Sequence, residues 1–423
     1  MTLNPNQLAA LLLAIVLGNA LLVWLCRAPE ARGSSHGGKL LFGSLLVLFP
    51  LSLFFAGWEM YWNRSEDVML GVLLYLPVQA VFTAIMFFRY NRQLSSTAGW
   101  GRLLLGNGLL LLVPLTLTLA IGEIYFRFFY DTTDSIAYTK VSQRWIKRHY
   151  HYNKAKFRDN VEYSLAIAPG KRRVSFLGDS FTAGHGIKDV ADRFSNRLRQ
   201  LHPDWEVHVL AANGLDTGGE LVFLEGYTGR GYQVDEVVLV YCLNDVNDLF
   251  TDYNQALETV AAKVSGRLPF YDDSYFLDTL YHRLTIARLP WIKNYFSYVR
   301  DVYQGAKWEE QKQRLRRMRD LAEQRGGRLS VVTFPFLNAL GKDYEYQFVH
   351  DQLNAFWREE GVPHLDLLPL FRDYQPDQLT VNAFDAHPNE FANKLATPRI
   401  DAFLVERLAT PKAKASAQSP PGK

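Results

Sequence analysis

Cysteine is nearly absent from this chain, because only Cys26 and Cys242 occur among 423 residues. No disulfide framework is therefore available, and any folded part outside the cytoplasm depends on its hydrophobic core instead. A large excess of one charge is also lacking, since 46 Lys and Arg residues face 43 Asp and Glu residues and the formal net charge is only +3. Such a nearly equal number of basic and acidic residues gives no support to nucleic-acid binding, and we expect no nucleic-acid partner.

Charged residues are missing altogether from four apolar runs in the first third of the chain. Each run is close to the roughly 20 residues that span a bilayer as a helix. Buried helices of a large soluble protein are the alternative, but four uncharged runs in succession favour a membrane region. We therefore predict four transmembrane helices within residues 1–122, with the lipid bilayer as a partner. The runs are 8–26, 40–58, 68–88 and 103–122.

Basic residues cluster in the loops after the first and third runs, where Arg27, Arg32, Lys39, Arg89, Arg92 and Arg102 lie. The positive-inside rule places these two loops in the cytoplasm and both termini outside. The first run has no basic segment before it and no clear cleavage site, so it is expected to remain as a span. These features predict a multi-pass protein of the cytoplasmic (inner) membrane. Its large C-terminal part would lie on the extracytoplasmic, periplasmic side.

The rest of the chain divides by composition. Residues 123–168 form a connector rich in aromatic and basic side chains, and residues 169–408 form the main domain. An aromatic-rich insertion at about 251–304 is expected either to act as a lid or sugar-stacking surface, or only to pack on the domain or the membrane. Residues 409–423 are rich in Pro, Lys, Ser and Gln and are predicted to be disordered.

Apolar strands alternate with helical patterns throughout the main domain. This alternation predicts a parallel sheet covered by helices on both faces, with the functional site at the carboxyl ends of the strands. The predicted strands are 173–177, 207–211, 236–242, 329–334 and 364–367, and the predicted helices are 190–201, 218–229, 308–324 and 344–359.

The first of these strands runs into the sequence Gly178-Asp179-Ser180. Gly178 permits a tight turn, and Ser180 would then begin a helix, among unpaired backbone N–H groups that favour developing negative charge. An acyl-transfer nucleophile is suited to this position, although Asp-Ser pairs also cap ordinary helices.

Three further elements follow in order along the chain. Gly214 comes after the second strand and can bring a backbone N–H close to a substrate oxygen. Asn244 comes after the third strand and can donate its amide to the same oxygen. Near the C-terminus, Asp385 and His387 supply a carboxylate and a base two positions apart.

These four blocks resemble the SGNH hydrolases, also called the GDSL esterase/lipase family, over about residues 171–408. The resemblance implies a three-layer α/β/α, flavodoxin-like fold with no metal or organic cofactor. It also implies that Ser180 is the nucleophile and His387 the base. The oxyanion hole would combine the N–H groups of Ser180 and Gly214 with the side chain of Asn244.

Two departures from the family pattern affect the site. Cys242 and Leu243 precede Asn244-Asp245, so the glycine usual in the third block is missing. The fifth block is commonly Asp-x-x-His, whereas Asp385 stands only two residues before His387. Asp385 is still expected to hold the imidazole tautomer, with a backbone carbonyl as the alternative.

Other polar residues near these motifs have structural interpretations. We expect His185 to be a loop histidine and Asp179 to support the turn by hydrogen bonds. Asp245, Asn247 and Asp248 resemble metal ligands in type, but their adjacency on a strand-to-helix turn favours capping.

The leading functional hypothesis is a membrane-anchored serine esterase or O-acyltransferase. It would act on ester groups, chiefly O-acetyl groups, of envelope or extracellular glycans. The alternative is an inactive glycan-binding scaffold of an envelope polysaccharide assembly system. A third hypothesis is that the four spans form a transport or partner-docking unit that recruits the enzyme, with envelope-assembly membrane proteins as possible partners. The few polar side chains of the spans argue against a proton or ion pathway.

Overall fold

The computed structural model describes residues 114–250, 253–266, 269–341 and 343–410, with four short helical pieces between residues 73 and 85. The chain forms two compact units, one of Met1–Asp131 with Leu268–Tyr281 and one of Thr132–Arg267 with His282–Lys423. The first two predicted membrane runs, most of the other two, and the tail beyond residue 410 lie outside the described residues. In the part that is described, no helix is both long and apolar enough to cross a membrane.

A buried acid, Glu123, joins two described segments of the first unit. Residues 114–124 are helical and lead into η1 (Tyr125–Phe129). Glu123 accepts hydrogen bonds from Ser274 Oγ at 2.6 Å and from the backbone N–H groups of Tyr275 and Phe276 at 3.0 and 2.9 Å. These N–H groups begin α11 (Tyr275–Leu284), which follows α10 (Pro269–Asp273). A carboxylate suits this position because the first N–H groups of a helix have no partner within the helix.

The second unit contains a five-stranded parallel sheet in the order β2-β1-β3-β4-β5. The central strands are continuous apolar runs that are buried on both faces, as expected of parallel sheets. All five strands predicted from the sequence are confirmed within two residues at each end. They are β1 (Arg172–Gly178), β2 (Trp205–Ala211), β3 (Glu236–Cys242), β4 (Arg328–Phe334) and β5 (His364–Asp366).

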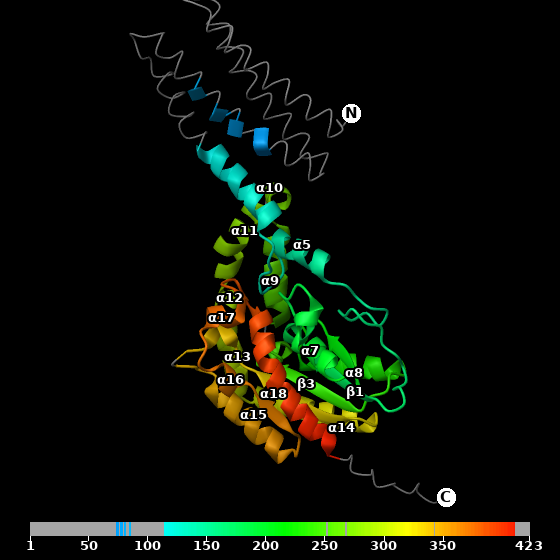
Figure 1. Cartoon of the computed structure of the whole chain (residues 1–423). Coiled ribbons are helices and arrows are strands. Elements are labelled where there is room, and N and C mark those ends of the chain that lie inside the picture. The colour runs from blue at the N-terminus through cyan, green and yellow to red at the C-terminus, as the bar shows by residue number, and fades with distance from the viewer. Residues whose placement is uncertain are drawn as a thin grey trace, which may run out of the picture. The chain divides into compact units, whose positions relative to one another are not determined.

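Helices cover both faces of this sheet. Helix α7 (Phe194–Leu201) packs against α18 (Glu390–Ala409), and α8 (Thr217–Gly229) packs against α14 (Lys307–Gln324) (Figure 1). The strand order reverses direction at β1, so right-handed crossovers place the two pairs on opposite faces. Helix α15 (Gln347–Glu359) connects β4 to β5. The predicted doubly wound α/β fold is therefore confirmed.

A short antiparallel ribbon follows the sheet in the chain. It pairs β6 (Thr380–Asn382) with β7 (Asp385–Pro388), after the short helices α16 (Leu368–Phe371) and α17 (Pro376–Leu379). Asn389 ends the ribbon and caps α18, accepting a hydrogen bond from the N–H of Ala392 at 2.9 Å. The ribbon carries both Asp385 and His387.

The remaining elements are short. Helix α5 (Lys140–His149) lies in the connector, and α6 (Ser180–Ala183) follows β1. The insertion contains α9 (Tyr253–Ser265), α12 (Pro290–Lys293) and α13 (Tyr295–Gln304), besides α10 and α11. Single 3₁₀ turns occur at η2 (Val190–Asp192), η3 (Asn247–Leu249), η4 (Ile286–Arg288) and η5 (Leu337–Ala339).

The connector is tied to the loop after α6 by Arg158, which is 2% exposed. Its guanidinium donates to the carbonyls of Ala183 at 3.0 Å, Ile187 at 2.5 Å and His149 at 3.2 Å. A fixed planar fork of five donors can satisfy several carbonyls at once. One buried side chain therefore fixes the connector beside the segment that contains Ser180.

Candidate active site

Ser180 lies directly beyond the carboxyl end of β1, at the first position of α6. Asp179 caps this one-turn helix, with its Oδ1 accepting from the N–H of Phe181 at 2.8 Å. The turn requires glycine at position 178, because a Cβ there would lie 2.3 Å from Thr182 Oγ1 and 2.9 Å from the carbonyl oxygen of Val240. The close approach of β1 and β3 thus dictates the first residue of the Gly-Asp-Ser motif.

Ser180, His387 and Asp385 form a continuous hydrogen-bonded series. Ser180 Oγ lies 2.8 Å from His387 Nε2, and His387 Nδ1 lies 2.5 Å from Asp385 Oδ1. The short spacing of Asp385 and His387 works because both belong to β7, where residues two apart point to the same side of the strand. The backbone N–H of His387 also donates to Asp385 Oδ1, at 3.1 Å.

Burial and charge shift the pKa values of Asp385 and His387 in opposite directions. Burial favours the neutral acid of Asp385, but the charge and hydrogen bond of His387 outweigh it and hold the carboxyl pKa well below its usual range. Burial likewise disfavours imidazolium at His387, yet the charge and hydrogen bond of Asp385 outweigh it and raise the pKa. The carboxylate therefore fixes the proton of the neutral imidazole on Nδ1, which leaves Nε2 free to accept the proton of Ser180.

The residues predicted for the oxyanion hole follow strands on either side of β1. Ala211, at the end of β2, pairs with Gly178, and Val240 of β3 pairs with Gly178 on the other side. Gly214 and Asn244 come three and four residues after these positions, so both lie at the sheet edge that carries Ser180. Gly214 has φ of +77°, and no atom lies within 4 Å of the place where a Cβ would stand.

Asp179 links Ser180 to Asn244 of the third block. Its Oδ2 lies 3.3 Å from Ser180 Oγ and accepts a hydrogen bond from Asn244 Nδ2 at 3.3 Å. Burial raises the pKa of Asp179, although the N–H of Phe181 and the charge of His387 oppose the change. Asp179 thus supports the turn, as expected, and also orients the Asn244 amide.

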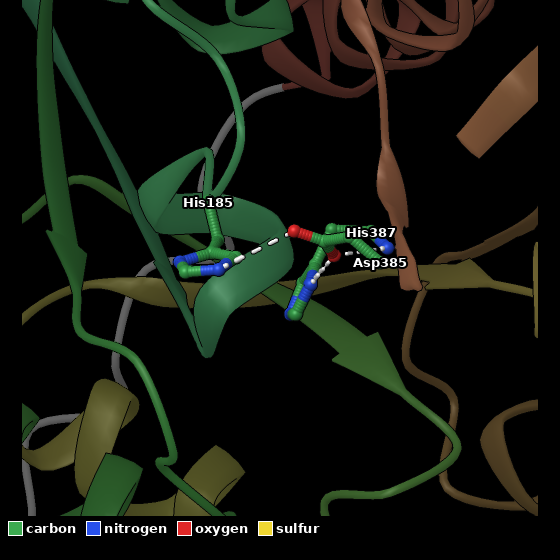
Figure 2. A group of neighbouring side chains, drawn as sticks. All are labelled: His185, Asp385 and His387. Atoms are coloured by element: carbon green, nitrogen blue, oxygen red, sulfur yellow. Dashed lines mark hydrogen bonds and ion pairs between the residues drawn. The ribbon is translucent and has the colours of Figure 1, made fainter. Parts of the chain in front are cut away.

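His185 lies beside the Asp385 carboxylate oxygen that does not face His387 Nδ1 (Figure 2). Its Nε2 is 3.5 Å from Asp385 Oδ2 and 3.1 Å from the carbonyl oxygen of Asp134. The hydroxyl of Thr133 donates to the same Asp385 oxygen. The sequence prediction of a loop histidine missed this contact, because nothing in the spacing of the motifs links residues 133 and 185 to residue 385.

A metal ion is the other ligand that these side chains suggest by type. Among the residues that the structure describes, His185, Asp385 and His387 are the one group whose ligand atoms all lie within 4.8 Å of one another. In the hydrogen-bonded arrangement, however, the imidazole nitrogens that face the carboxylate carry protons. A metal would have to displace those protons and break the contact between His387 and Asp385.

Asp245, Asn247 and Asp248, the other possible metal ligands by residue type, each bind a different protein group. Asp245 Oδ2 accepts from the N–H of Cys242 at 2.9 Å, and Asn247 Oδ1 accepts from the Tyr295 hydroxyl at 3.0 Å. Asp248 pairs with Arg314 at 2.5 Å. These contacts give each side chain a structural role. Asp245 also closes the turn at which the family glycine is missing.

Comparison with known proteins decides the family. A profile of the GDSL-like lipase/acylhydrolase family matches residues 176–395, which is just over half of the chain. The chain belongs to this family. It is accordingly a serine hydrolase that acts on ester bonds, and the SGNH resemblance inferred from the sequence is confirmed at this level.

Solved structures of the GDSL group cover about half of the chain at low identity. A GDSL lipolytic protein from Veillonella parvula is 14% identical with a TM-score of 0.33, covering 57% of this chain and all of its own length. An extracellular lipase from Streptomyces rimosus is 15% identical with a TM-score of 0.35, covering 55% of this chain and 99% of its own. A search of curated proteins found no match.

Proposed function

We propose that this GDSL hydrolase is a membrane-anchored esterase or O-acyltransferase that acts on ester groups, chiefly O-acetyl groups, of envelope or extracellular glycans. The observation that carries the proposal is the unbroken series from Ser180 Oγ through His387 to Asp385, with separations of 2.8 and 2.5 Å. The same series argues against the alternative of an inactive glycan-binding scaffold, because binding alone does not require an activated serine.

The chemistry follows from the positions of the protons. As Ser180 Oγ forms a bond to the ester carbonyl carbon, its proton passes to His387 Nε2. The bond to the leaving alcohol then breaks, and Nε2 returns the proton to that alcohol. Asp385 stabilises the imidazolium between these two steps. An acyl-Ser180 intermediate remains, and water or a sugar hydroxyl takes the acyl group by the reverse sequence.

Negative charge on the carbonyl oxygen would be stabilised by the N–H groups of Ser180 and Gly214 and by Asn244. The Asn244 amide has two N–H bonds, and the bond to Asp179 at 3.3 Å uses only one of them. Its second N–H is therefore available to the oxyanion while Asp179 holds the side chain in place. Donors fixed in advance stabilise the transition state without reorganisation cost.

The glycan substrate is supported by the aromatic insertion. Tyr295 donates to Asn247, three residues beyond Asn244, and its ring lies 5.6 Å from that of Trp291 and 6.3 Å from that of Phe250. These rings are half-buried. Aromatic faces of this kind suit the apolar faces of sugar rings.

The membrane location rests on the sequence. Four uncharged apolar runs and the distribution of basic loop residues predict an extracytoplasmic domain. The described end of the fourth run adds support, because this helical segment leaves Leu115 and Ile121 56% and 64% exposed. Apolar side chains exposed on a helix are compatible with lipid. Envelope-assembly membrane proteins are proposed as partners of the same region.

The test uses the full-length chain in detergent with an aryl acetate and with an O-acetylated oligosaccharide, in the presence and absence of an unmodified oligosaccharide acceptor. Turnover should disappear in Ser180→Ala and persist in Ser195→Ala, which removes a buried hydroxyl outside the series. Acetylated acceptor identifies a transferase, and free acetate alone identifies an esterase. An intact protein that gives neither product nor an acyl adduct on Ser180 would favour the scaffold.

A further inference from the structure

We propose that His185 is a positioning residue that acts on Oδ2 of the catalytic carboxylate of Asp385, the oxygen that does not face His387 Nδ1. This inference rests on the proposed series of Ser180, His387 and Asp385. It adds a second histidine that acts on the reaction only through Asp385.

The hydrogen bonds of His185 define its tautomer. Asn213 Nδ2 donates to His185 Nδ1 at 2.9 Å. The Asn213 amide is oriented in turn by Tyr150, whose hydroxyl donates to Asn213 Oδ1 at 2.9 Å. Because Nδ1 accepts a hydrogen bond, the proton of the neutral ring lies on Nε2. That N–H donates to the carbonyl of Asp134 at 3.1 Å, and Nε2 lies 3.5 Å from Asp385 Oδ2.

The charge state of His185 also suits this role. Its ring centroid lies 4.5 Å from that of His387, so a charged His185 would oppose formation of the His387 imidazolium during catalysis. Asp385 faces the ring, the Asp134 carbonyl accepts from it, and the hydroxyl of Tyr150 lies 3.5 Å from Nδ1. Burial and the neighbouring His387 together lower the pKa of His185 to about 4, against the charge of Asp385. A neutral donor therefore supports the carboxylate without adding a competing positive charge.

The geometry of Asp385 explains why it needs such support. Its Oδ1 faces both the ring N–H and the backbone N–H of His387. Its Oδ2 receives no donor from the ribbon. It accepts from the Thr133 hydroxyl and lies 3.5 Å from His185 Nε2, and both residues come from distant parts of the chain. Without them the carboxylate could rotate and lose its alignment with Nδ1. A small displacement of this kind costs up to about a hundredfold in rate.

Two substitutions of His185 distinguish the contact made by its Nε2 from the contact made by its Nδ1. In His185→Gln, the side-chain Nε2 can occupy the position of the imidazole Nε2 and keep a donor toward Asp385. In His185→Asn, the amide reaches only the position of Nδ1 and leaves Asp385 without that donor. His208→Asn is the matched control, since His208 is also buried but contacts Tyr227 and Tyr163 instead of the site.

The experiment measures kcat and KM of the full-length chain with an aryl acetate, the rate at which an organophosphonate labels Ser180 by intact mass, and the melting temperature. We expect His185→Asn to lower kcat and the labelling rate by about tenfold or more, with KM within twofold. His185→Gln should restore most of both rates, and His208→Asn should leave both unchanged.

Three results would overturn the inference: wild-type rates in His185→Asn, an equal loss in His185→Gln, or a loss that follows the melting temperature across all three variants. These are distinct from failure of the proposed function. If the folded wild-type chain neither turns over ester nor reacts with phosphonate, the proposed series is inactive and the inference fails with it. If the wild type reacts and His185→Asn reacts equally fast, only the inference fails.

Discussion

Asp385→Asn is the sharpest perturbation of the site, because the carboxylate is surrounded by hydrogen-bond donors. Its Oδ1 faces the Nδ1–H of His387 at 2.5 Å and the backbone N–H of His387 at 3.1 Å. Its Oδ2 accepts from the Thr133 hydroxyl and faces His185 Nε2 at 3.5 Å. An asparagine NH₂ group must therefore oppose donors in either orientation.

The expected loss in kcat follows from the tautomer of His387 that the asparagine amide would favour. An NH₂ group placed on the Oδ1 side donates to His387 Nδ1, which moves the ring proton to Nε2, where it can no longer accept the proton of Ser180. Loss of the correct tautomer costs about 10⁴ in kcat, or roughly 5 kcal/mol of transition-state stabilisation. The pH profile should change as well. The limb of kcat/KM that reports His387 should move to lower pH, because burial continues to lower its pKa after the opposing charge is removed.

The assay is hydrolysis of an aryl acetate from acid to mildly alkaline pH, with the melting temperature recorded for each preparation. Asp401→Asn is a suitable control, since Asp401 also pairs with a histidine, His202, at 2.5 Å but lies on α18 outside the site. A loss of less than tenfold in a folded Asp385→Asn variant, or an unmoved pH limb, would refute the assignment of Asp385 to the series.

Three further predictions concern the oxyanion hole, the turn and acid stability. Asn244→Ala should lower kcat by roughly a hundredfold or more with little change in melting temperature, because it removes one oxyanion donor; a loss below fivefold in steady-state kinetics would contradict that role. Gly178→Ala should destabilise the fold by about 1–3 kcal/mol in thermal unfolding, because the new Cβ overlaps Thr182 Oγ1; unchanged stability would show that the turn can relax. Asp159 is buried and bonded to Arg199 at 2.6 Å, which outweighs burial and holds its pKa below the ordinary 3.8. Its stabilising contribution is therefore present above that ordinary value and is lost as pH falls through the lower folded value, so Asp159→Asn should reduce the acid dependence of the unfolding free energy measured in urea.

The sheet could be predicted from the sequence because its central strands are largely apolar, and burial on both faces requires such segments. Glu236–Cys242 is the clearest case, with its predicted bounds unchanged in the structure. The ribbon of β6 and β7 was not predicted, since three or four residues give too little periodicity to distinguish a strand from a loop. Helix α18 was also missed as an element, and Pro398 within it works against a helical prediction.

In the candidate site, too, features set by adjacent residues could be predicted, whereas contacts between distant residues could not. Ser180 could be predicted because the strand, the glycine and the cap are adjacent in the chain, and each constrains the next. Contacts of Asp385 with Thr133 and His185 span 252 and 200 residues, and no local propensity encodes them. Such contacts depend on packing between elements that sequence patterns describe one at a time.

The two-residue spacing of Asp385 and His387 shows how such contacts compensate for a local departure. On a strand this spacing places both side chains on one side, but it directs the backbone N–H of His387 and its ring N–H to the same carboxylate oxygen. The other oxygen must then be satisfied from outside the ribbon, because a buried carboxylate oxygen without donors is costly. Thr133 supplies such a donor, His185 Nε2 lies 3.5 Å from the same oxygen, and Arg158 fixes the connector beside the loop that carries His185. Family resemblance begins near residue 171, yet the groups that complete the acid begin near residue 133. The carboxylate of the shortened fifth block is therefore completed by a hydroxyl from the connector, which lies outside every motif.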